Sequence, residues 1–108
     1  MSWHVNFLEE AEADMNELDG SAKKQVDAAI LKVSQNPLPK SEGGYGNPLG
    51  NKHDNNLTGL CKIKLLKLGI RVVYKLIREN EVMIIVVVAA RADEEVYKIA
   101  AKRIQDDK

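Results

Sequence analysis

Nine consecutive apolar residues, Val82 to Ala90, form the most apolar segment of this 108-residue chain. A helix that crosses a bilayer needs about 20 such residues, so this segment is too short to span a membrane. It is rich in valine and isoleucine and shows no alternation with polar residues, which is typical of a strand covered on both faces. The sequence therefore predicts a central strand within Glu81 to Ala90.

Two further strands are predicted directly before this one. In Leu60 to Leu66, apolar and polar residues alternate, and the same pattern returns in Ile70 to Ile77. Lys67-Leu68-Gly69 and Glu79-Asn80 supply the turns between the three strands. The second half of the chain therefore predicts a strand meander.

Helices are predicted on either side of the meander. A short strand, Trp3 to Phe7, precedes a helix from Leu8 to Leu18 that Gly20 ends, and Ser21 can cap a second helix that stops at Asn36-Pro37. Asp93 can cap a last helix. The predicted order is βααβββα. The fold class is α+β, with a helix hairpin packed on a small, mainly antiparallel four-stranded sheet and a C-terminal helix.

Residues 37–59 are rich in Gly, Pro and Asn and lack any hydrophobic period. They predict a long loop, and loops beyond about 12 to 15 residues in a compact domain are usually functional or mobile. A lid or docking element is one interpretation, and a domain linker is the other. The pieces on either side are too small to fold alone, so residues 1–108 are predicted to form one domain.

The charge is balanced overall but unevenly distributed. Residues 1–60 carry five basic and nine acidic side chains, and residues 61–108 carry eleven basic and seven acidic ones. Net neutrality argues against a nucleic-acid partner, yet this separation allows a basic surface to coexist with a neutral total. A lone cysteine, Cys61, excludes an internal disulfide, and the first residues show no signal peptide, so a cytoplasmic location is expected.

Three cations on neighbouring strands form the candidate site. Lys62 and Lys64 project from one face because they are two residues apart, and Arg71 can lie beside one of them across the hairpin. A phosphate between them would relieve their repulsion, and arginine can bind two of its oxygens. The alternative is that lysines on an exposed edge strand prevent aggregation.

Arg91 and Tyr97 extend the candidate site. Arg91 follows the most apolar strand, so we expect it near the core with Asp93, Glu94 or Glu95 as its partner. Tyr97 borders the apolar stripe of the last helix, where a core tyrosine with a satisfied hydroxyl is the alternative to a functional one.

These segments closely resemble the RelE toxins of bacterial type II toxin-antitoxin systems. The resemblance rests on Cys61 to Leu65, Gly69 to Tyr74, Arg91, Glu95 to Tyr97 and Ala100 to Ile104. It implies a ribosome-dependent mRNA endonuclease that cleaves the codon in the A site and so inhibits translation. It also implies a RelB-like antitoxin as partner, in a toxin-antitoxin hetero-oligomer, with ribosome and mRNA as the other partners. The catalytic residues that it implies are Lys62, Lys64, Arg71, Arg91 and Tyr97.

No cofactor is expected, because the sequence has no cluster of His, Cys and carboxylate ligands for a metal, and His4 and His53 are incidental. Attack by the RNA 2′-hydroxyl then needs a general base, for which we consider Tyr97 or Lys64. Arg71 and Lys62 would hold the phosphate, and Arg91 would stabilise charge or assist the leaving group. Two alternatives remain open at this point. They are a gyrase-poisoning, ParE-like toxin of the same fold and a non-toxic relic that only binds an antitoxin.

Overall fold

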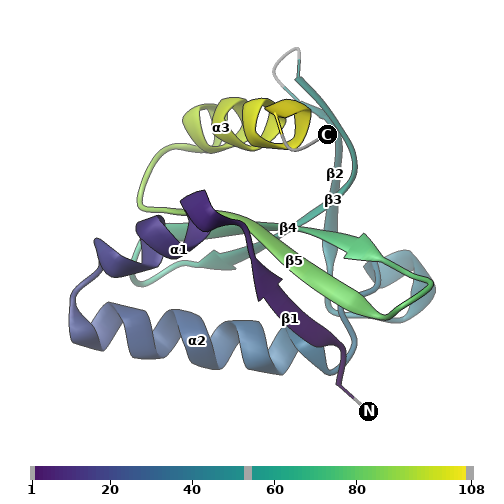
Figure 1. Cartoon of the computed structure of the whole chain (residues 1–108), viewed down its shortest axis with the longest axis horizontal. Helices are drawn as coiled ribbons and strands as arrows, with labels where there is room; N and C mark the ends of the chain where they lie inside the picture. The colour runs from purple at the N-terminus through teal and green to yellow at the C-terminus, as the bar shows by residue number, and fades with distance from the viewer. Residues whose placement is uncertain (1, 53–54, 107–108) are drawn as a thin grey trace.

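Five strands form one sheet with helices on both faces (Figure 1), within residues 2–52 and 55–106, which the computed structural model describes. The strand order is β1-β5-β4-β3-β2. The strands are β1 (His4–Phe7), β2 (Asn47–Lys52), β3 (Asn55–Leu65), β4 (Ile70–Ile77) and β5 (Val82–Ala89). The helices are α1 (Glu9–Asn16), α2 (Gly20–Ser34), the 3₁₀ turn η1 (Lys40–Glu42) and α3 (Asp93–Asp106). None of these helices is long and apolar enough to cross a bilayer.

The apolar strand β5 is central, as its sequence predicts. It pairs in parallel with β1 and antiparallel with β4. One buried cluster joins this sheet to α1 and α2, and a second joins its other face to α3, so valines at successive positions of β5 are all buried. Figure 1 shows α2 and α3 on opposite sides of the sheet. The α+β class is confirmed.

The prediction of a loop over residues 37–59 is wrong for its second half, which forms β2 and the start of β3, so the sheet has five strands instead of four. Residues 47–52 form β2, which pairs with the first half of a longer β3. Pro48 is tolerated because β2 is an edge strand, and the register shifts between Pro48 and Gly50, where glycine adopts φ +62°. Leu49 and Leu57 of this hairpin are buried in the cluster beneath α3. His53 lies outside the described residues.

Three predicted helix ends differ from the structure. Asp19, not Ser21, caps α2, because its carboxylate accepts a hydrogen bond from the Ala22 amide at 2.8 Å. Gly20, predicted to end the first helix, is instead the first residue of α2. Asp93 is the first residue of α3 and not its cap, and its carboxylate is turned to a different partner described below.

An ion pair binds the backbone groups of β5 that extend beyond the end of β1. The last β1 residue, Phe7, pairs with Ile85, so β5 continues without a neighbour on that side. There the Val88 amide donates to Asp14 of α1 at 3.0 Å, and the Val86 carbonyl accepts from Arg103 of α3 at 2.9 Å. Asp14 and Arg103 also bind each other at 2.7 Å, with side chains 14% and 18% exposed. This ion pair replaces the hydrogen bonds of the missing strand and links the two helices.

Candidate functional site

The β3–β4 hairpin brings three of the predicted cations onto the face that carries α3. Lys64 lies directly opposite Arg71, and Lys62 lies opposite Val73, which is buried beneath α3. The sequence left open which lysine lies beside Arg71, and the register selects Lys64. Lys64 is exposed, whereas Lys62 and Arg71 are half-buried.

The position of β3 in the sheet tests the alternative that Lys62 and Lys64 protect an exposed edge strand from aggregation. Lys62 has neighbours on both sides, Asn47 of β2 and Val73 of β4, so it is not an edge residue. Lys64 lies beyond the last pair with β2 and has only β4 beside it. Protection of an edge therefore fits Lys64 but not Lys62.

Lys62 is held against Tyr97 of α3. Its ammonium nitrogen donates to the Tyr97 hydroxyl at 3.0 Å and lies 5.7 Å from the centre of the ring. Tyr97 is 2% exposed and its ring packs in the cluster beneath α3. Tyr97 is thus a core residue through its ring and part of the cationic site through its oxygen.

Arg71 is bound on several sides at the start of α3. Its Nε donates to the Asp93 carboxylate, and its Nη1 donates to the carbonyl oxygens of Arg91 at 2.7 Å and Gly69 at 3.3 Å. Pairing of Arg71 with Ala89 explains this arrangement, since the chain that leaves β5 then passes beside the guanidinium. The hairpin and the first turn of α3 are therefore tied together through one arginine.

Asp93 is the residue of this site that the sequence did not assign to it. Partial burial raises the pKa of its carboxyl, but the hydrogen bond from Arg71 and the positive charges of Arg71, Lys62 and Lys64 outweigh burial, so the pKa is lowered overall. The pairing of Arg71 with Ala89 brings the segment after β5 close to Arg71. Only this β4–β5 register could have indicated the contact between Arg71 and Asp93. One carboxylate thus lies among three of the cations.

The lowered pKa of Asp93 predicts an acid-dependent loss of stability. A carboxyl with a lower pKa in the folded than in the unfolded chain stabilises the fold above its unfolded pKa and loses that effect as the pH falls through the folded value. We expect Asp93→Asn to lower the urea midpoint at pH 7 and to have little effect near pH 2, below the usual aspartate range. Glu94→Gln, an exposed neighbour in the same helical turn, is the control. An equal effect of Asp93→Asn at both pH values would contradict the assignment.

The Arg91 side chain pairs with Glu95 and not with the other four predicted residues. The expectation that it is near the core is wrong, because β5 ends at Ala89 and Arg91 falls in the exposed link to α3. Of the three acids considered, its partner is Glu95, at 3.0 Å, with both side chains about 60% exposed. Its backbone carbonyl nevertheless accepts from Arg71, so the two residues are neighbours through the main chain.

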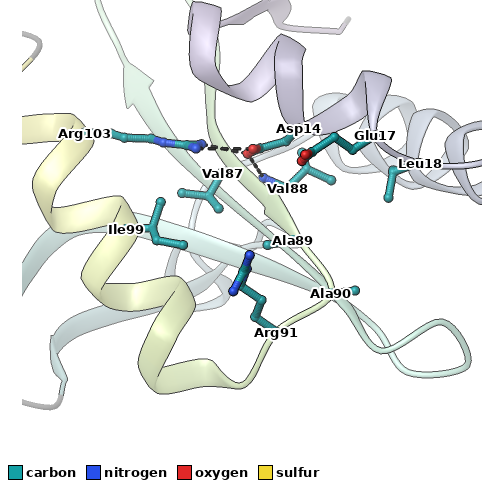
Figure 2. A pocket seen from close by; sticks show the side chains of 10 residues that line it. All are labelled: Asp14, Glu17, Leu18, Val87, Val88, Ala89, Ala90, Arg91, Ile99 and Arg103. Carbon is teal, nitrogen blue, oxygen red and sulfur yellow. Dashed lines mark hydrogen bonds and ion pairs between the residues drawn. The ribbon is translucent and has the colours of Figure 1, made fainter.

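Figure 2 shows the Arg91 side chain beside a hollow of about 510 Å³ between α1, β5 and α3. Charged residues of both signs and apolar side chains line this hollow, and Lys62, Lys64, Arg71 and Tyr97 are not among the described residues that do so. Its lining is Asp14, Glu17, Leu18, Val87, Val88, Ala89, Ala90, Arg91, Ile99 and Arg103. To join the other cations, the Arg91 guanidinium must leave Glu95.

Other candidate ligands are not gathered into a site in the described part of the chain. No group of three or more His, Cys, Asp or Glu side chains with metal-binding geometry occurs among residues 2–52 and 55–106. His4 is exposed on β1, and Cys61 is buried.

Relatives of this chain among known proteins include RelE toxins. No protein-family model matches the chain. The mRNA interferase toxin RelE of Escherichia coli K12 is 29% identical over 104 residues, which are 96% of this chain and 99% of RelE. A putative RelE-like toxin protein of E. coli is 29% identical over 105 residues, 97% of this chain and 100% of its own length.

Solved structures give the same result. A free double arginine mutant of E. coli RelE superposes with a TM-score of 0.76 at 28% identity, covering 96% of this chain and 99% of RelE. The same mutant in complex with a peptide of the antitoxin RelB gives a TM-score of 0.69 at 27% identity, covering 95% and 98%.

The sheet order and the helices on both faces of the sheet therefore belong to a fold that this chain shares with RelE toxins. Among the relatives compared, the likeness to E. coli RelE extends over nearly all of both chains, in sequence and in fold. The resemblance to RelE toxins seen in its sequence is therefore confirmed.

Proposed function

We propose that this protein is the toxin of a toxin-antitoxin module and acts as an mRNA interferase that cleaves the codon in the ribosomal A site. The observation that carries the proposal is the near full-length likeness to E. coli RelE, named an mRNA interferase toxin. The grouping of Lys62, Lys64 and Arg71 beside Tyr97 supports it, because such a cluster suits the phosphate of an RNA strand.

The proposed reaction needs only the chemistry of RNA and of these side chains. A base removes the proton of the 2′-hydroxyl, and the 2′-oxygen forms a bond to the adjacent phosphorus. The bond from phosphorus to the 5′-oxygen then breaks, and that oxygen takes up a proton. The products are a 2′,3′-cyclic phosphate and a 5′-hydroxyl, and cations stabilise the extra negative charge of the transition state.

Geometry suggests a role for each residue. Lys64 is exposed and can reach a bound strand as the base. Tyr97 is the second candidate base, since its hydroxyl oxygen lies 3.0 Å from the Lys62 ammonium, beside the proposed phosphate ligands. Arg71 and Lys62 bind the phosphate, and Arg91 stabilises the leaving oxygen after it separates from Glu95. The acidic surface of α1, with Glu9, Glu10 and Glu12 in its first turn, lies outside this set.

The proposed partners are mRNA on the ribosome and a RelB-like antitoxin, with which the protein forms a hetero-oligomer in the cytoplasm. The complex of E. coli RelE with a RelB peptide supports the antitoxin as partner. An acidic segment of the antitoxin would be attracted to the cationic hairpin.

Cleavage on a programmed ribosome tests the proposal. We expect the purified protein to cut an mRNA within the A-site codon, in EDTA-treated buffer that retains only the magnesium the ribosome needs, and to leave the same mRNA intact without ribosomes. Primer extension locates the cut. DNA damage signalling without mRNA cuts would instead indicate a gyrase poison. Unimpaired growth and translation after overexpression would indicate a relic that only binds its antitoxin.

A further inference from the structure

The Asp93 carboxylate binds one cation of the cluster and lies near the other two. It accepts the Nε hydrogen of Arg71 from β4, and the charges of Lys62 and Lys64 act on it from β3. Its side chain is 33% exposed, so the position is open to solvent on one side. The cluster of three cations is therefore already partly neutralised by a residue of the same chain.

A carboxylate and a phosphodiester compete for the same donors. Each carries one negative charge and offers two oxygens to the N–H groups of a guanidinium. Arg71 already gives Nε to Asp93 and Nη1 to the Arg91 and Gly69 carbonyls. An RNA phosphate that takes the Nε of Arg71 must therefore replace Asp93.

We propose that Asp93 is a built-in competitor that fills the phosphate site of the free protein, and that an RNA phosphodiester binds by displacing it. The ligand class rests on the proposed function, whereas the site rests on the contacts of Arg71 alone. Displacement moves the first residue of α3 away from the β3–β4 hairpin. The competing carboxylate lowers the affinity for free RNA, so cleavage depends on contacts that the ribosome adds.

Titration with inorganic phosphate tests this exchange directly. The full-length protein is followed by NMR at constant ionic strength, using the backbone amides of Arg71 and Ala92. Asp93→Asn removes the charge but keeps an oxygen that can accept from Arg71. Glu94→Gln makes the same change of charge one residue away, at an exposed position with no ion pair in the described structure.

We expect Asp93→Asn to bind phosphate about five-fold more tightly than the wild type, and Glu94→Gln less than about two-fold more tightly. Equal effects of the two substitutions would mean that only the net charge matters, and would overturn the proposal. Weaker binding by Asp93→Asn would also overturn it, because Asp93 would then position Arg71 for the anion. Asp93→Ser, checked by circular dichroism, provides a second variant should the asparagine disturb α3.

Cleavage on the programmed ribosome separates this inference from the proposed function. If Asp93→Asn binds phosphate more tightly but neither protein cleaves mRNA, the role of Asp93 as competitor is supported and the nuclease function is refuted. If the wild type cleaves mRNA but Asp93→Asn binds phosphate no more tightly than the wild type, the nuclease is supported and the role of Asp93 as competitor is refuted.

Discussion

Replacing Tyr97 with phenylalanine is expected to lower the single-turnover rate of A-site cleavage by about 100-fold or more, the usual contribution of a general acid or base. The substitution removes one oxygen and keeps the ring that packs beneath α3. The lost hydrogen bond from Lys62 costs about 1 kcal/mol of stability, so the variant stays folded. A quench-flow measurement on programmed ribosomes gives the rate, and thermal unfolding checks the fold.

Lys98→Ala is the matched control for this experiment. Lys98 follows Tyr97 on α3 but is exposed, so its removal changes the charge without touching the Lys62 contact.

Lys64→Ala, measured beside Tyr97→Phe, identifies the base as the residue whose loss flattens the pH dependence of the rate. Arg91→Ala should slow cleavage as well. Wild-type rates in both Tyr97→Phe and Arg91→Ala would rule out the proposed site.

The strands of the meander could be predicted from sequence because their signals are local. The Ile70 to Ile77 strand has the predicted bounds, since its alternation begins directly after Gly69, which adopts φ +67° in the turn. The apolar run of β5 also fixes its position, because a strand without a polar face must be covered on both sides.

Strand β2 could not be predicted because it depends on its partner. Its sequence, Asn-Pro-Leu-Gly-Asn-Lys, has low strand propensity and no alternation. Pairing with β3 and burial of Leu49 stabilise it, and neither interaction is visible in a local pattern. Long-range contacts here override composition.

The alternation of side chains along a strand predicts one part of the site, whereas a β-bulge determines another part. The shared face of Lys62 and Lys64 comes directly from a spacing of two residues. The β4–β5 register shifts by one residue between Val73 and Tyr74, which leaves Val86 without an opposite residue. This shift places Ala89 opposite Arg71. It helps decide that Asp93 meets the cationic hairpin with its side chain, while Arg91 meets it with its backbone carbonyl.

Stability is expected to depend strongly on Arg103, the residue that replaces a neighbour strand beside β5. Arg103→Leu leaves the Asp14 carboxylate, 14% exposed, without its cation and removes the hydrogen bond to the Val86 carbonyl. We expect a loss of about 3 kcal/mol in the free energy of unfolding, because an unpaired charge then stays mostly buried. Urea denaturation at pH 7 measures the loss.

Two further variants test whether the buried, unpaired Asp14 carboxylate causes the loss of stability. Asp14→Asn in the Arg103→Leu background should restore part of the stability, since a neutral amide needs no cation and can still accept from the Val88 amide. Arg78 forms an ion pair of similar two-point geometry with Glu42, at 2.7 and 2.8 Å, but both side chains are exposed. Arg78→Leu should therefore change the urea midpoint little. If both arginine substitutions lowered the midpoint equally, burial at the end of β1 would not explain the effect.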